Sequence, residues 1–303
     1  MDVTQCSIRP ARADDYDDVV AFTQHTWPDR DGSDYLPDVY HEWIDGDPER
    51  TRTLVADVGD AIAGICQLVM LSDHEAWAQG MRVNPDFRGD GISTKLNHAL
   101  FDWATDHGAT VCRNMVFSWN DAGLGGSRSI GFEPVTEFRW AQPEPESVSL
   151  PETVVSDPTL AWQYWENSAT RTHLGGLALD TEESWALSLL TREDLSATAE
   201  DGGVYAVVDD GVQAMTCRTA VRTREIADGE TETTVEYGVG AWDDLQSAQA
   251  LFAAIRADAA ELGADATRVL IPETARAVSD AAYLRATISD EPDFVLSADL
   301  SDW

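Results

Sequence analysis

Basic residues are scarce in this chain. Lysine occurs once, as Lys95, and Lys plus Arg number 20 against 55 Asp plus Glu among 303 residues, so the formal net charge is −35. The sequence pI is about 4.1. A surface this acidic repels nucleic acids and anionic membranes. We therefore expect no nucleic-acid or membrane partner.

Other features are also missing. The four cysteines, Cys6, Cys66, Cys112 and Cys217, lie far apart without a C-x-x-C motif, which predicts free thiols in a reducing compartment. The six histidines lack partners at metal-ligand spacing, and no G-x-S-x-G elbow is present, so a metal site and a serine hydrolase are not expected. No apolar run approaches membrane-spanning length, and no stretch resembles a signal peptide. We expect a cytoplasmic protein without metal.

The charge is spread along a chain that is 43% hydrophobic, which predicts a folded protein with an acidic surface. The length is sufficient for two domains with separate cores. The composition resembles that of haloarchaeal cytosolic proteins, in which molar salt screens the repulsion between surface charges.

One stretch, 83–96, reads V-N-P-D-F-R-G-D-G-I-S-T-K-L and joins an expected strand to an amphipathic helix. Glycine allows a tight turn and close approach of a ligand, and the first amides of a helix form an anion site. The spacing fits neither a P-loop nor a Rossmann fingerprint, whose third glycine would stand at Thr94. A plain strand-to-helix turn is the alternative interpretation.

The pattern V-x-P-x-x-R-G-x-G-[IV]-x-x-x-L resembles the GNAT superfamily of acyl-CoA-dependent N-acetyltransferases. The resemblance implies that Arg88, Gly91 and Ser93 hold the pyrophosphate of coenzyme A, and that acetyl-CoA is the co-substrate. It also implies that backbone groups near Met81 and Val83 align the cofactor arm. The full set of expected cofactor-binding residues is Met81, Val83, Arg88, Gly89, Asp90, Gly91, Ile92, Ser93 and Asn120.

The order of expected elements also resembles this family. A short strand at 7–11 precedes helices starting near Asp14 and at 37–44, then strands at 53–58, 61–71 and 74–83, the loop, a helix from Gly91 to Gly108, and a strand at 111–117. We expect Ile92, Leu96, Ala99, Leu100 and Trp103 to form the buried stripe of the long helix. Asn120 and the pair Gly131-Phe132, which leads into the last strand, keep the family spacing.

Two residues are the candidates for proton transfer. Ser127 stands where the family often has a tyrosine that protonates the leaving thiolate, and a serine is a shorter and weaker donor. Glu75 is the expected base acting through water, because alternation places it on one strand face with Trp77, Gln79, Met81 and Val83. Asp73 and His74 are alternative bases, and a solvated strand end is the alternative interpretation of Glu75.

We expect a GNAT domain over 1–142, a Pro-rich linker at 143–150, and a degenerate GNAT-like domain over 151–303. The second half repeats a hairpin at 203–221, and its Ala250-Leu251-Phe252 helix ends at Gly263-Ala264 as the first ends at Gly108-Ala109. Its loop, 240–244, lacks arginine, and a capping box of Asp243 and Gln246 would satisfy the free amides. The expected fold is α+β, a mixed and mostly antiparallel sheet flanked by helices, in two tandem copies.

The resemblance implies an N-acetyltransferase in which a primary amine attacks acetyl-CoA directly in a ternary complex. The amine would be a small molecule or peptide, and the chain a monomer or homodimer. An acyl-CoA-binding regulatory or scaffold protein without turnover is the alternative. A platform in which neither half binds a nucleotide is a third interpretation.

Overall fold

The computed structural model describes residues 6–24, 26, 34–226 and 229–303. The chain forms two compact units that are both discontinuous in sequence. Unit 1 comprises 1–115, 121–134 and 296–303, and unit 2 comprises 116–120 and 135–295. No helix in the described part of the chain is long and apolar enough to cross a membrane.

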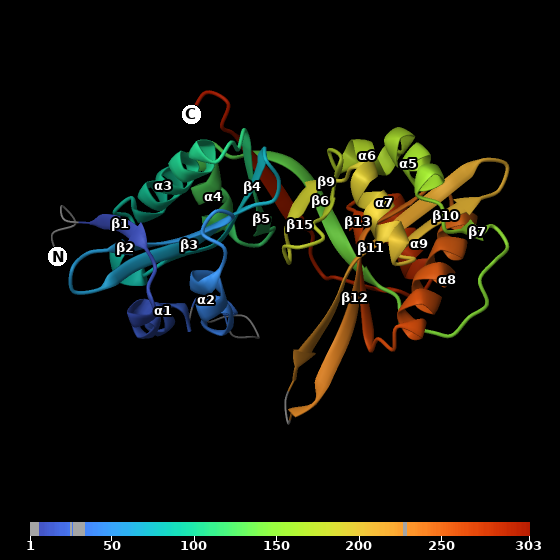
Figure 1. Cartoon of the computed structure of the whole chain (residues 1–303), viewed down its shortest axis with the longest axis horizontal. Coiled ribbons are helices and arrows are strands. Elements are labelled where there is room, and N and C mark those ends of the chain that lie inside the picture. The colour runs from blue at the N-terminus through green and yellow to red at the C-terminus, as the bar shows by residue number, and fades with distance from the viewer. Residues whose placement is uncertain (1–5, 25, 27–33, 227–228) are drawn as a thin grey trace. The chain divides into compact units, whose positions relative to one another are not determined.

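Unit 1 is a mixed sheet with helices on both faces (Figure 1). Its strand order is β1-β2-β3-β4-β5-β15, in which β1 to β4 are antiparallel and β4 is parallel to β5. Its elements are β1 (Ser7–Pro10), η2 (Ala13–Asp15), α1 (Tyr16–Thr23), α2 (Leu36–Asp45), β2 (Thr51–Asp57), β3 (Ile62–Met70), β4 (Glu75–Val83), η3 (Pro85–Phe87), α3 (Ile92–Asp106), β5 (Val111–Phe117), α4 (Asp121–Ser129) and the end of β15 (Asp293–Asp299).

The central strand β3 is buried along its whole length, as a strand covered on both faces and apolar at nearly every position should be, with Gln67 as its one amide side chain. On one face, Ile65 joins a core with Val19, Leu36 and Tyr40 from α1 and α2. On the other face, Gly64 lets α3 approach closely, since a Cβ there would lie 3.0 Å from Ile92 Cγ2. The expected stripe of α3 is buried at Ile92, Leu96 and Leu100, while Asn97, Phe101 and Ala104 complete it in place of Ala99 and Trp103.

Unit 2 also contains a parallel strand pair bridged by a long helix. Its strand order is β7-β10-β11-β12-β13-β6-β15, and β12 is parallel to β13. Its elements are β6 (Glu133–Gln142), β7 (Val154–Val155), α5 (Pro158–Asn167), α6 (Ala169–His173), β8 (Leu177–Leu179), β9 (Leu187–Leu189), α7 (Arg192–Glu200), β10 (Val204–Val208), β11 (Val212–Glu225), β12 (Thr231–Trp242), α8 (Leu245–Glu261), β13 (Ala266–Pro272), α9 (Ala275–Tyr283), β14 (Thr287–Ile288) and the start of β15.

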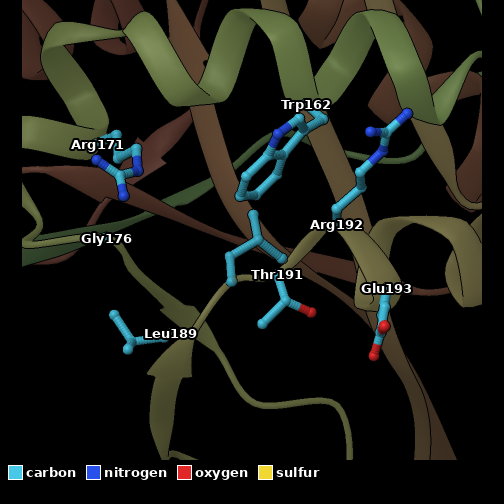
Figure 2. A pocket seen from close by; sticks show the side chains of 8 residues that line it. Trp162, Arg171, Gly176, Leu189, Thr191, Arg192 and Glu193 are labelled. Carbon is cyan, nitrogen blue, oxygen red and sulfur yellow. The ribbon is translucent and has the colours of Figure 1, made fainter.

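A surface hollow of about 480 Å³ lies among α5, α6 and the start of α7 (Figure 2). Trp162 stands at its centre with Arg171 and Arg192 on either side and Leu189 below. The amides at the start of α7 are already capped by Thr191, which accepts from Asp194 N. The lining therefore combines an apolar wall with two guanidinium groups.

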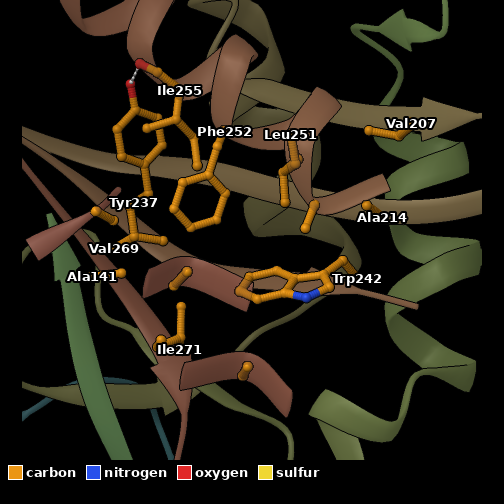
Figure 3. Packing of buried hydrophobic residues seen from close by; sticks show 14 of the residues in the cluster. Ala141, Val207, Ala214, Tyr237, Trp242, Leu251, Phe252, Ile255, Val269 and Ile271 are labelled. Carbon is orange, nitrogen blue, oxygen red and sulfur yellow. Dashed lines mark hydrogen bonds between the residues drawn. The ribbon is translucent and has the colours of Figure 1, made fainter. Parts of the chain in front are cut away.

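The core of unit 2 lies between its sheet and the helices α8 and α9 (Figure 3). Trp242 packs in it with Phe252, Val269 and Ile271. The Trp242 indole Nε1 donates to Asp280 Oδ2 at 3.0 Å, so its polar atom is satisfied.

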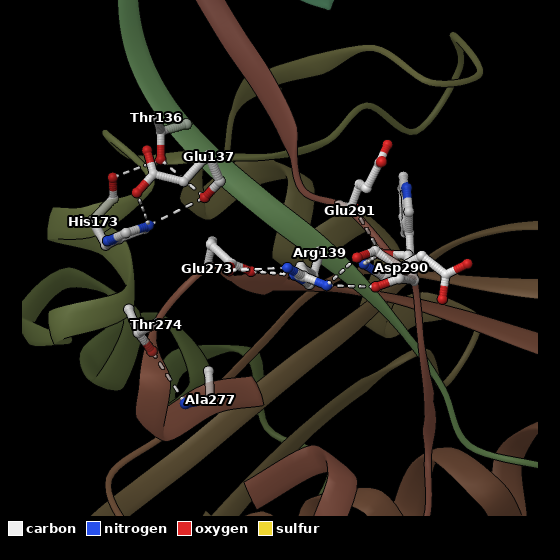
Figure 4. Close-up of polar contacts among 11 residues, drawn as sticks. Thr136, Glu137, Arg139, His173, Glu273, Thr274, Ala277, Asp290 and Glu291 are labelled. Carbon is white, nitrogen blue, oxygen red and sulfur yellow. Dashed lines mark hydrogen bonds and ion pairs between the residues drawn. The ribbon is translucent and has the colours of Figure 1, made fainter. Parts of the chain in front are cut away.

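Each unit contains a strand from a part of the chain that is distant in sequence. The strand β6 follows α4 of unit 1 in sequence but pairs with β13 in unit 2, where Ala141 lies opposite Val269. It is held there by Arg139, which pairs with Glu273 and donates to Ser289 O at 2.7 Å (Figure 4). The residues expected as a linker, 143–150, fall within unit 2.

The last strand of unit 1 comes instead from the end of the chain. Residues 296–299 of β15 lie next to β5, and Leu300 N donates to Thr110 O at 2.9 Å. The Trp303 Nε1 donates to Asp102 Oδ1 of α3 at 2.8 Å. Unit 1 is therefore completed only by the final residues of the sequence.

A buried carboxylate in unit 2 gives a testable pH effect. Burial raises the pKa of the Asp293 carboxyl from 3.8 to about 6, while the Trp140 indole N–H donates to its Oδ2 at 3.0 Å. A raised folded-state pKa means that the native protein binds this proton more tightly than the unfolded chain, so stability falls as the pH rises from about 4 to about 6.

We expect Asp293→Asn to remove this penalty. The amide keeps an acceptor for Trp140, so at pH 7 the variant should be more stable by roughly 1–3 kcal/mol. Denaturant unfolding of variant and wild type from pH 4 to 7 measures the difference. A gap that stays constant across this range would contradict the assignment.

Candidate active site

The loop between β4 and α3 has the backbone geometry that the sequence predicts. Gly89 and Gly91 have φ values of +88° and +72°, and a Cβ on either would meet nothing within 4 Å. Phe87 is buried and anchors the loop, and Asn84 Oδ1 accepts from Asp86 N at 3.1 Å. Gly91 is the N-cap of α3, which has no side-chain cap and no acidic residue in its first turn. The first amides of α3 are therefore available to an anion.

Two cations accompany these amides. Arg88 and Lys95 are exposed, and within the described ranges no carboxylate lies at ion-pair distance from either. Arg82, at the end of β4, is engaged elsewhere, since its Nε donates to Asp34 Oδ2 at 2.6 Å and its guanidinium lies 5.6 Å from the Tyr35 ring centre. An unpaired arginine and the only lysine of an acidic chain thus lie next to the uncapped helix.

Beyond the loop, β4 and β5 pair only at their first residues. The parallel register runs from Glu75–Val111 to Trp77–Arg113, although both strands continue past these positions. A bulge in β4 accompanies this separation, with Gly80 at φ +64° and the ring of Trp43 packed on it.

The bulge corrects the expected alternation of β4. Gln79 lies opposite Gln67 and Arg82 opposite Ile65, so Gln79 and Arg82 face the same side. Met81 and Val83, both partly exposed, therefore do not continue the face of Glu75 and Trp77 as expected. One extra residue shifts the register of every side chain after it.

Glu75 is neither a solvated strand end nor free in a cleft. It is only 8% exposed, and the Arg113 guanidinium of β5 donates to its carboxylate. The alternative bases Asp73 and His74 are exposed in the β3–β4 turn, where Leu71 N donates to Glu75 O at 2.8 Å. All three lie at the far end of β4 from the loop, and Glu75 is about 26 Å of strand length from Val83.

Ser127 lies on α4, and its Oγ accepts a hydrogen bond from Asn114 Nδ2 of β5 at 3.0 Å. Asn114 was not expected from sequence, because it belongs to no family motif. Asn120 belongs to unit 2, where its backbone N–H donates to Phe117 O at 2.9 Å. Among the described residues no group of three His, Cys, Asp or Glu side chains could hold a metal.

In unit 2 the connection from β12 to α8 is closed to an anion. The N-cap is Asp244, which forms a capping box with Ser247, so the expected pair of Asp243 and Gln246 was wrong by one residue. The Asp243 carboxylate instead accepts from Tyr164 Oη at 2.9 Å. A carboxylate occupies the position at which a phosphate would approach the helix.

Comparison with known proteins agrees with this geometry. Residues 16–125 match the model of the Acetyltransferase (GNAT) family. The chain therefore contains a GNAT acetyltransferase family domain, and its α+β architecture of a mixed sheet flanked by helices is the GNAT fold.

Three solved structures resemble nearly the whole chain. A GCN5-related N-acetyltransferase from Sphaerobacter thermophilus has 16% identity and a TM-score of 0.60, covering 98% of this chain and 96% of that one. A protein from Thermoplasma acidophilum with a provisional acetyltransferase assignment has 17% identity and a TM-score of 0.55, covering 97% and 99%. Another such protein, from Pyrococcus horikoshii, has 14% identity and a TM-score of 0.53, covering 99% and 91%. Comparison with curated sequences gave no match.

Proposed function

We propose that unit 1 is an acetyl-CoA-dependent N-acetyltransferase domain. The observation that carries this proposal is the uncapped start of α3 behind Gly89 and Gly91, next to Arg88 and Lys95, which have no ion-pair partner among the described residues. Amides at a helix start and a guanidinium together bind a diphosphate well. The loop Arg88–Ser93 would hold the pyrophosphate, and the separating ends of β4 and β5, with Met81 and Val83, would receive the arm of coenzyme A.

The proposed reaction uses these positions. A primary amine attacks the thioester carbonyl directly, a C–N bond forms, and the C–S bond breaks. We assign Ser127 as the donor of the proton to the leaving thiolate. Glu75, fixed by Arg113, would accept the proton of the amine through water, because no carboxylate of β4 lies closer to the loop.

We also propose that unit 2 is a second GNAT copy that has lost the cofactor site. Gly108-Ala109 precede Arg113 in β5 at the spacing at which Gly263-Ala264 precede Arg268 in β13. Each arginine pairs with a glutamate of the neighbouring parallel strand, Arg113 with Glu75 and Arg268 with Glu236.

The positions that carry chemistry in unit 1 differ in unit 2. Both α4 and α9 are followed by a residue with positive φ, Gly131 at +99° and Arg285 at +62°. With these aligned, Ser127 corresponds to Ala281, which is buried in the core with Trp242. This supports one cofactor site per chain.

The proposed function is tested by free thiol release. We expect wild-type protein in molar salt to release thiol from acetyl-CoA with at least one amine of a panel containing small cationic amines and peptide N-termini. Ser127→Ala should lower kcat by about tenfold or more while leaving coenzyme A affinity unchanged, because it removes only a proton donor.

The second candidate is an acyl-CoA-binding protein without turnover, favoured by the serine at position 127. Binding of coenzyme A without thiol release for any amine would support it. Acetyl-CoA that neither binds nor reacts would exclude both.

A further inference from the structure

Asn114 occupies the point at which β4 and β5 part. The last paired residues are Trp77 and Arg113, and Asn114 is the next residue of β5. Its side chain reaches Ser127 of α4, which is the only residue of the described chain to which a hydrogen bond from this carboxamide is seen. It therefore lies between the separating strands and the proposed proton donor.

The direction of this hydrogen bond orients the serine. Asn114 Nδ2 donates to Ser127 Oγ at 3.0 Å, so the serine oxygen is the acceptor and its own hydrogen points elsewhere. In the reverse amide orientation, Oδ1 would face Ser127 and the two N–H donors of Nδ2 would take the place that Oδ1 holds now. That arrangement leaves two donors unsatisfied where the present one leaves a single acceptor, so it is the poorer of the two.

The carbonyl oxygen of the Asn114 carboxamide has no hydrogen-bond donor among the described residues. Asn114 Oδ1 is buried and has no hydrogen-bond partner in the structure. Buried acceptors in folded proteins are nearly always satisfied, and an unsatisfied one destabilises the fold. The unsatisfied Oδ1 lies where β4 and β5 separate, so it can accept a hydrogen bond from an N–H group of a ligand bound there.

We propose that Asn114 is a positioning residue of the acetyl-transfer site. Its Oδ1 accepts an N–H from a bound ligand, and its Nδ2 turns the Ser127 hydroxyl towards the leaving thiolate. As the C–S bond breaks, the sulfur takes the Ser127 proton, and the proton that Glu75 accepts from the amine later returns to Ser127 through water. This inference rests on the proposed function of unit 1.

Two N–H groups fit the open acceptor, an amide of the coenzyme A arm and the nitrogen of the attacking amine. Kinetics and calorimetry separate them. If the arm supplies the donor, Asn114→Leu weakens coenzyme A binding; if the amine does, it raises the KM of the amine and leaves coenzyme A affinity unchanged.

Asn114→Leu has the same branching without polar atoms. We expect its Tm to equal or exceed that of wild type, because an unsatisfied buried acceptor is removed, while kcat/KM falls about tenfold or more. If Asn114 had a purely structural role, both the Tm and kcat/KM of the variant would fall. Asn167→Leu, at an exposed asparagine of α5 in unit 2, is the matched control and should leave kcat/KM unchanged.

Asn114→Asp tests the orientation of Ser127. A carboxylate accepts the serine hydrogen and withdraws it from the thiolate, whereas the protonated acid can donate as the amide does. The rate of this variant relative to wild type should therefore rise as the pH is lowered. A ratio that does not change with pH overturns the orienting role.

The outcomes also separate this inference from the function on which it rests. Wild-type protein that binds no coenzyme A overturns the proposed function. Wild-type protein that binds and turns over, together with an Asn114→Leu variant of equal kcat/KM, overturns only the role of Asn114.

Discussion

Arg88→Glu is expected to weaken coenzyme A binding by about 100-fold or more. The change removes a charge-assisted hydrogen bond to phosphate and adds a like charge next to it, and each tenfold in affinity corresponds to about 1.4 kcal/mol. Isothermal titration calorimetry of the full chain in molar salt measures the effect, and wild type should bind one molecule per chain. Binding of two coenzyme A molecules per chain would contradict the proposal that unit 2 has lost its cofactor site.

The matched control for this variant is Arg192→Glu. It reverses the charge of an arginine that is also exposed but lies in unit 2, whereas Arg88 lies in unit 1. Coenzyme A affinity should not change. Gly91→Val is a second test at the loop, because φ +72° is strained for a β-branched residue and the first amides of α3 would turn away. If coenzyme A binds equally well to Arg88→Glu, Gly91→Val and wild type, the loop is not the pyrophosphate site.

A chain that ends at Val295 is expected to lose the fold of unit 1. It lacks the strand next to β5 and the buried side chains of Leu296 and Leu300. Burial of a leucine contributes about 1.5–3 kcal/mol, so these two alone approach the lower end of the 5–15 kcal/mol that stabilises a typical domain. Coenzyme A binding should disappear, and circular dichroism should show partial loss of structure.

A chain that ends at Leu300 is the control, because it keeps β15 and loses only the contacts of residues 301–303. It should retain binding with a lower Tm. A synthetic peptide of residues 293–303 added to the segment 1–142 should restore some binding of coenzyme A. A segment 1–142 that folds and binds by itself would show that β15 is dispensable.

The sequence predicts the loop well because its geometry is local. Positive φ at Gly89 and Gly91, the uncapped helix and the preceding strand are determined by neighbouring residues. The hairpins around Gly59 and Gly211 are predicted for the same reason, since each joins strands that pair directly.

The parts that sequence could not predict depend on residues far apart in the chain. Glu75 reads as a solvated acid because its partner, Arg113, lies on another strand. The ion pair of Arg82 with Asp34 likewise joins residues 48 positions apart, which local sequence patterns do not signal. The bulge at Gly80 is signalled by the glycine itself, but its effect on Met81 and Val83 requires the register with β3.

The placement of β6 is the clearest case. The pair Gly131-Phe132 leads into a strand, as predicted, but periodicity does not say which sheet receives it. In β6 buried residues alternate with partly exposed ones from Thr136 to Trp140, a pattern that fits an edge of any sheet, and only the register of β6 with β13 assigns the strand to unit 2.

This arrangement also sets the order of events during synthesis. Residues 135–295 must be translated between the last internal segment of unit 1 and the strand that completes it. At about 5–20 residues per second, the nascent N-terminal unit waits roughly 10–30 s on the ribosome with one sheet edge open. The many negative charges of the emerging chain would discourage neighbouring polysome products from pairing with that edge until residues 296–303 have been synthesised.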